Sequence, residues 1–148
     1  MSIESIKRLS SIWFYAVFGV LILALLVWTS LRTLQETPSR EVSVQLPDQG
    51  WITFRLGTEP FPPLPTGIVT LNLAIVNNRG APIDFGPSIP FVFGAMGIDT
   101  PQDGGEVVWN GRAYQNGIQF PTAGDYWLYF DLGGGKQVDF QVYVKPAQ

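Results

Sequence analysis

The side chains that most often carry out chemistry in proteins are histidine and cysteine, and this chain of 148 residues contains neither. Without them there is no disulfide, cysteine nucleophile, iron–sulfur cluster, zinc finger or Ser-His-Asp triad. Blue copper centres need histidine and cysteine ligands, and Met96 is the only methionine after Met1. One thioether cannot hold copper, so we expect no resident metal and no cofactor.

Carboxylates are the remaining groups with chemical potential. Asp99, Asp103 and Glu106 lie in the stretch IDTPQDGGE, whose hard oxygen ligands suit a calcium ion. The spacing does not match an EF-hand, and acidic glycine-containing loops between strands are usually solvated, so both interpretations of residues 99–106 stay open. No spacing places two acidic residues in one cleft as acid and base, and no glycine-rich phosphate loop opens a helix. We expect no catalytic residue and no enzymatic activity.

Charge is distributed unevenly along the chain, whose formal net charge is −3. Residues 1–40 contain four basic and two acidic residues, whereas residues 41–148 contain five basic and ten acidic residues. Nucleic-acid binding requires clustered lysine and arginine to neutralise phosphates. We therefore expect the acidic part of the chain to bind no nucleic acid, and nothing in it predicts a small-molecule substrate.

The longest uncharged segment covers residues 9–31 and reads LSSIWFYAVFGVLILALLVWTSL. A helix of about 23 residues is about 34 Å long, enough to cross a hydrocarbon core of about 30 Å. Trp13 and Tyr15 lie near one end and Trp28 near the other, as aromatic residues do at the two membrane–water interfaces. The sequence predicts one transmembrane helix over 9–31. A cleaved signal peptide is less consistent, because its apolar core is about 7–15 residues long and precedes a small-residue cleavage site.

The residues around this segment predict its orientation. Lys7 and Arg8 lie in a short N-terminal tail, residues 1–8, which the positive-inside rule places in the cytoplasm. The chain is then a single-pass protein of the cell membrane, with its C-terminal part on the outer (periplasmic or extracellular) face. Gly19 could let a partner helix approach closely in lipid, or it could be a tolerated glycine on a lipid-facing helix.

The hydrophobic period changes from helical to alternating after a polar linker, residues 32–40, that contains Pro38. The expected strands cover 41–46, 51–56, 68–77, 89–94, 106–109, 112–120, 125–132 and 136–145. Seven or eight short strands in a domain spanning 41–148 are typical of an immunoglobulin-like antiparallel β-sandwich. The apolar faces of the last two strands should form its core; these are Tyr126, Leu128, Phe130, Val138, Phe140, Val142 and Val144.

Two features of this domain favour contact with a partner, and each has a local alternative. Trp127, Tyr129 and Tyr143 fall on the polar faces of the last two strands, where they could form a protein interface or stack across the hairpin. The stretch TEPFPPLPTG, residues 58–67, should be extended polyproline. It could present Phe61 and Leu64 to a partner, or serve as a stiff connection between sheets.

Residues 58–145 resemble the YtkA-like group of membrane-anchored outer-face domains. The resemblance rests on Gly80-Ala81-Pro82 after a long strand, on the methionine-containing loop FGAMG, and on a strand start of the type F-x-x-x-G-x-[YW]-x-L. Phe120, Gly124, Tyr126 and Leu128 occupy that strand start. Members of the group are associated with copper handling or with the assembly of respiratory oxidases. The lack of histidine and the single loop methionine separate this chain from copper handling.

Together these observations predict a non-catalytic accessory subunit of a multi-subunit membrane complex. The resemblance implies a respiratory or photosynthetic electron-transport complex, such as alternative complex III or a terminal oxidase. The partners would be the other subunits and the lipid bilayer, contacted through Gly19, Trp127, Tyr129 and Tyr143. The alternative is a free-standing membrane-anchored assembly factor, or a binding module related to copper handling.

Overall fold

The structure, a computed structural model, describes residue 15, residues 17–29 and residues 40–148. The chain divides into two compact units, Met1–Glu36 and Thr37–Gln148. In the first unit, residue 15 and residues 17–29 are helical and exposed. Within the described ranges, no helix is both long and apolar enough to cross a membrane. The helix predicted over 9–31 includes residues 9–14, 16, 30 and 31, which lie outside the described residues, as do the predicted tail 1–8 and residues 32–39 of the linker.

The second unit is built from strands, and all eight predicted strands are confirmed. They are β1 (Arg40–Leu46), β2 (Gly50–Glu59), β3 (Val69–Asn77), β4 (Ser88–Ala95), β5 (Asp103–Trp109), β6 (Tyr114–Ile118), β7 (Gly124–Gly133) and β8 (Lys136–Val144). Only their ends differ from the prediction. Arg40 already pairs with Leu56 and belongs to β1 rather than to the linker, and β5 begins at Asp103 rather than Glu106.

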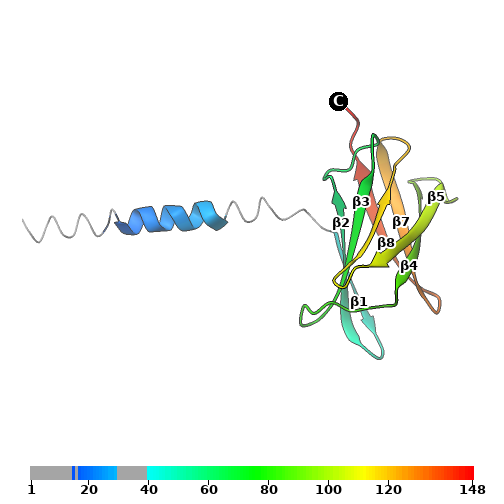
Figure 1. Cartoon of the computed structure of the whole chain (residues 1–148), viewed down its shortest axis with the longest axis horizontal. Coiled ribbons are helices and arrows are strands. Elements are labelled where there is room, and N and C mark those ends of the chain that lie inside the picture. Colours follow the sequence, from blue (N-terminus) through cyan, green and yellow to red (C-terminus); the bar gives the residue numbers. More distant parts are fainter. Residues whose placement is uncertain (1–14, 16, 30–39) are drawn as a thin grey trace, which may run out of the picture. The chain divides into compact units, whose positions relative to one another are not determined.

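The strands form one antiparallel sheet in the order β1-β2-β3-β6-β5-β4-β7-β8 (Figure 1). Only two residue pairs, Val108↔Gln115 and Trp109↔Tyr114, join β5 to β6. The sheet therefore has two halves, β1-β2-β3-β6 and β5-β4-β7-β8, which curl over a shared core. Within residues 40–148 no ladder joins β1 to β8, so the arrangement approaches a barrel without closing.

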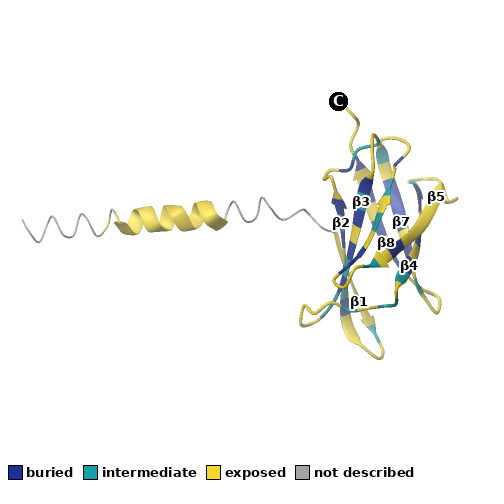
Figure 2. Ribbon diagram, viewed as in Figure 1, coloured by how far each residue is buried: buried dark blue, intermediate teal, exposed yellow. Residues whose placement is uncertain are grey.

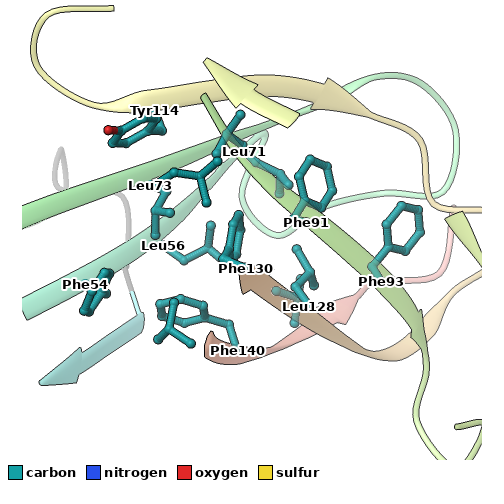
Figure 3. Close-up of a cluster of buried hydrophobic side chains, with 14 of the residues drawn as sticks. Phe54, Leu56, Leu71, Leu73, Phe91, Phe93, Tyr114, Leu128, Phe130 and Phe140 are labelled. Carbon is teal, nitrogen blue, oxygen red and sulfur yellow. The ribbon is translucent and has the colours of Figure 1, made fainter. Parts of the chain in front are cut away.

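The core lies between the two halves, where side chains from β2 and β3 point toward those from β4, β7 and β8 (Figure 3). Buried and exposed residues alternate along most strands (Figure 2), as expected for sheets with one face packed and one face solvated. The predicted inner faces of β7 and β8 are confirmed, because all seven side chains are buried. Phe130 contacts Phe91 of β4 and Phe140 of β8, with ring centroids 5.5 and 5.9 Å apart.

Two buried tyrosines fasten loops to this core through their hydroxyl groups. Tyr126, near the start of β7, donates to the Thr122 carbonyl at 3.0 Å and accepts from the Thr122 N–H at 3.3 Å. Tyr114 of β6 accepts from the Phe85 N–H at 2.6 Å. Its single proton has two acceptors, the Gly86 carbonyl at 2.9 Å and the Asp84 carboxylate at 3.2 Å. Tyr114 thus holds the loop between β3 and β4 against β6.

We expect Tyr114→Phe to lower the free energy of unfolding by about 1–3 kcal/mol, because the Phe85 N–H loses its acceptor. Burial, reinforced by Asp84, raises the pKa of Tyr114 above its ordinary value. A raised folded-state pKa gives stability that is complete below the unfolded-state value, about 10, and is lost as the pH rises further. Urea unfolding between about pH 8 and 11 should therefore show a shallower alkaline loss for the variant than for the wild type.

A matched control for Tyr114→Phe is Tyr129→Phe, which removes a hydroxyl from a half-exposed side chain. This substitution should change the free energy of unfolding by less than about 0.5 kcal/mol at neutral pH. Parallel alkaline curves for Tyr114→Phe and the wild type would show that Tyr114 makes no contribution to the pH dependence.

The proline segment does not have the extended polyproline geometry predicted for it. Bends cover residues 60–62 and 65–67, and the Glu59–Pro60 and Phe61–Pro62 peptide bonds are cis. The Pro63 carbonyl accepts a hydrogen bond of 2.9 Å from the Lys145 N–H. The segment therefore lies against the end of β8, as a folded connection between β2 and β3.

Candidate functional site

Trp127 faces outward from the sheet, on the face where the sequence places it, yet its side chain is buried. The outward face of β7 carries Trp127 and Tyr129, opposite Gln141 and Asp139 of β8. The indole is only 9% exposed, because the loop between β4 and β5 covers it. Its Nε1–H donates a hydrogen bond of 2.9 Å to the carbonyl of Ile98 in that loop. Trp127 therefore packs against the loop rather than across the hairpin.

The backbone also holds the covering loop, residues 96–102, in place. The Met96 N–H donates to the Asp125 carbonyl of β7 at 2.9 Å, and the Gln102 N–H donates to the Phe93 carbonyl of β4 at 2.8 Å. Gly94 of β4, the register partner of Trp127, makes room for the indole. A Cβ atom at Gly94 would lie 2.6 Å from Cζ2 of Trp127 and 3.1 Å from the Thr100 carbonyl oxygen. Only glycine fits this close approach.

Tyr129 remains accessible and stacks on the buried indole. The two ring centroids are 4.7 Å apart with an interplanar angle of 27°, a favourable geometry for an aromatic pair. Tyr129 is 38% exposed and lies directly opposite Asp139. An aromatic ring and a carboxylate therefore stand side by side on the outer face.

These residues surround a groove of about 470 Å³, which we call the β7–β8 groove. It is lined by Met96, Gly97, Ile98 and Asp99 of the loop, Trp127 and Tyr129 of β7, and Asp139, Phe140 and Gln141 of β8. Met96 and Ile98 are half exposed. The groove thus combines an aromatic base, an apolar rim and two carboxylates.

Of the other two predicted contact residues, Tyr143 lies outside the groove and Gly19 belongs to the other unit. Tyr143 lines a smaller pocket of about 220 Å³ with Phe61, Pro62 and Arg40, away from the β7–β8 groove. Gly19 lies in the described helix, where an added Cβ would have no neighbour within 4 Å. Within the second unit the structure brings together Trp127 and Tyr129, whereas Tyr143 lies outside the groove.

The groove carries negative charge, from Asp99 and Asp139. Among the described residues the one ion pair joins Arg55 to Glu41, on β2 and β1, with an N···O distance of 2.7 Å. Asp99 and Asp139 therefore have no basic partner within ion-pairing distance in the part of the chain that the structure describes. In the same described residues no three Asp or Glu side chains gather as metal ligands. Asp103 and Glu106 of the acidic stretch belong to β5 rather than to the loop.

Sequence reasoning missed Asp139, Gln141 and the rim residues Met96 and Ile98. The alternation along β8 marks Asp139 as outward-facing, but the register that sets it opposite Tyr129 is not visible from one strand. Gly94, the first of the two glycines in FGAMG, was a usable signal, because a glycine within a strand often marks a place that another group approaches closely.

Chemically, the groove can stack a planar or apolar group and neutralise a positive charge. It offers nine lining residues, of which Asp99 and Asp139 are the charged ones.

In comparisons with known proteins, no family model, no curated protein and no solved structure shows significant similarity to this chain. The resemblance to the YtkA-like group stays a prediction from the sequence.

Proposed function

We propose that this chain is a non-catalytic docking subunit, anchored in the cell membrane by residues 9–31, that binds another subunit of a membrane complex through the β7–β8 groove. The observation that carries the proposal is the groove itself. Its exposed Tyr129, Met96 and Ile98 form an apolar surface beside the carboxylates of Asp99 and Asp139. Neither carboxylate has an ion-pair partner among the residues that the structure describes. Interfaces are enriched in tyrosine, tryptophan and methionine, and their contact energy is concentrated in a few such residues.

The finer parts of the proposal have separate support. The uncharged length of residues 9–31 supports a membrane anchor. Tyr126 supports an immunoglobulin-like classification, because a tyrosine near the start of the penultimate strand bonds back to the upstream backbone in that fold. The resemblance to the YtkA-like group supports an electron-transport complex as the assembly, such as alternative complex III or a terminal oxidase.

The proposal is tested by isolating the full chain, tagged at its C-terminus, from the cells that make it. We expect the protein in the membrane fraction, resistant to alkaline extraction, and in constant stoichiometry with the same partner subunits after mild detergent. Tyr129→Ala should weaken that association several-fold, because it removes the exposed ring of a central contact residue.

A suitable control is Val108→Ala, which truncates an exposed apolar side chain of β5 that does not line the groove. It should leave the association unchanged. A chain that always elutes alone would contradict the docking function. Substoichiometric amounts, absent from the finished complex, would identify an assembly factor instead.

A further inference from the structure

We propose that the β7–β8 groove recognises an arginine side chain presented by the partner protein. This inference rests on the proposed function, since it names the group that the docking surface receives. Three observations carry it: the rigid aromatic base of the groove, the carboxylates at its sides, and the charge of the sheet half around it.

The aromatic base of the groove consists of Trp127 and Tyr129, and the ring of Tyr129 is the accessible one. The indole of Trp127 is fixed by its hydrogen bond to Ile98 and by the close approach of Gly94. Tyr129 stacks on that fixed indole and keeps over a third of its surface exposed. A guanidinium group is planar and stacks on such rings, where it is attracted by the negative face of the π system.

The carboxylates lie where a stacked cation would need them. Asp139 is the register partner of Tyr129, and directly opposed residues of antiparallel strands have Cβ atoms about 5 Å apart. Asp99 lines the same groove from the loop. Neither has a basic partner among the described residues, so both are available to accept hydrogen bonds from a ligand.

The surrounding charge favours a cation over an anion. The two hairpins that form this sheet half, residues 88–109 and 124–144, contain six acidic residues and one basic residue, Lys136. The acidic residues are Asp99, Asp103, Glu106, Asp125, Asp131 and Asp139. Such a field attracts positively charged partners and repels acidic ones.

The shape of the groove favours arginine over a compact cation. The guanidinium fork can stack on Tyr129 and bond to a carboxylate at once, because its N–H donors lie in its own plane, parallel to the ring, and point outward past the ring edge. Met96 and Ile98 at the rim offer apolar contact to the methylene stem. A lysine ammonium is more strongly hydrated and lacks the planar face, so it would use only part of this surface.

The test uses the full-length chain in micelles of an uncharged detergent, with the blocked peptide acetyl-Gly-Arg-Gly-amide as the probe. Binding is followed by the NMR signal of the Trp127 indole N–H. We expect a saturable shift with the arginine peptide, weakened by added salt. The lysine peptide and the neutral, isosteric citrulline peptide should each bind at least about fivefold more weakly. The lysine peptide lacks the planar guanidinium fork, and the citrulline peptide lacks the positive charge.

Variants locate the binding in the groove. Asp139→Asn and Tyr129→Leu should each weaken arginine binding at least about fivefold, consistent with loss of a charge-assisted bond or of the ring face. The matched control is Asp125→Asn, an exposed aspartate of β7 that does not line the groove, and it should bind as the wild type does. Unchanged thermal unfolding of each variant shows that the fold is intact.

Three results would overturn the inference: no saturable shift, citrulline or lysine binding as tight as arginine, or binding that survives both groove substitutions. The docking function is judged separately, because it depends on co-purification of the chain with its partner. Persistent co-purification without arginine binding would discard the arginine inference and keep the docking subunit.

Discussion

Replacing Phe130 with alanine is expected to lower the free energy of unfolding by about 3–5 kcal/mol, the usual cost of truncating a buried phenylalanine. Phe130 is fully buried, and its ring contacts Phe91 and Phe140 from both neighbouring strands. These rings are fixed in three adjacent strands, so the site cannot collapse to fill the cavity. Domains of this size have a total stability of only about 5–15 kcal/mol. The variant should therefore unfold at a much lower urea concentration.

The comparison variant for Phe130→Ala is Val108→Ala, in which an apolar side chain is truncated on the solvent side of β5. Its free energy of unfolding should stay within about 0.5 kcal/mol of the wild type. A loss of less than about 1.5 kcal/mol for Phe130→Ala would show that the side chains around Phe130 move to fill the cavity.

The second large effect is expected from one added methyl group, in Gly94→Ala. The new Cβ would lie 2.6 Å from a ring carbon of Trp127, with the Thr100 carbonyl on its other side. The indole must move, so its bond to Ile98 and the cover of the loop are lost. We expect the free energy of unfolding to fall by about 1–3 kcal/mol, as is typical of overpacking. The variant should also lose arginine-peptide binding, although Gly94 itself does not line the groove.

A double-mutant cycle isolates the cause of the Gly94 effect. In a Trp127→Leu background the clash partner is smaller, so Gly94→Ala should cost less there than in the wild type, with a coupling of at least about 0.5 kcal/mol. Equal costs in both backgrounds would show that the methyl group disturbs the backbone of β4 rather than the indole.

The sequence was sufficient to predict the strands, because successive side chains face opposite sides of a sheet and apolar residues therefore recur at every second position. Val138, Phe140, Val142 and Val144 are buried as that period requires. At Trp127 the same rule gives the correct side of the sheet, but it does not reveal that the side chain is buried. Alternation tells which side of the sheet a residue faces, but not whether a loop from elsewhere in the chain covers that side.

The groove could not be predicted because its parts come from segments distant in sequence. Its walls belong to the loop at residues 96–99 and to β8 at residues 139–141. The pairing of Tyr129 with Asp139 depends on the length of the turn Gly133-Gly134-Gly135, in which all three glycines have positive φ. A turn one residue longer would place a different side chain opposite Tyr129.

The single hydrogen bond from Trp127 to Ile98 affects both the rate at which a ligand binds and its affinity. It couples the base of the groove to its rim, so both are in place before anything binds. A ligand that binds a preformed groove loses its own translational, rotational and conformational freedom, but the protein loses little conformational entropy. We therefore expect the free and occupied forms to have nearly the same backbone, with exchange limited by encounter rather than by rearrangement.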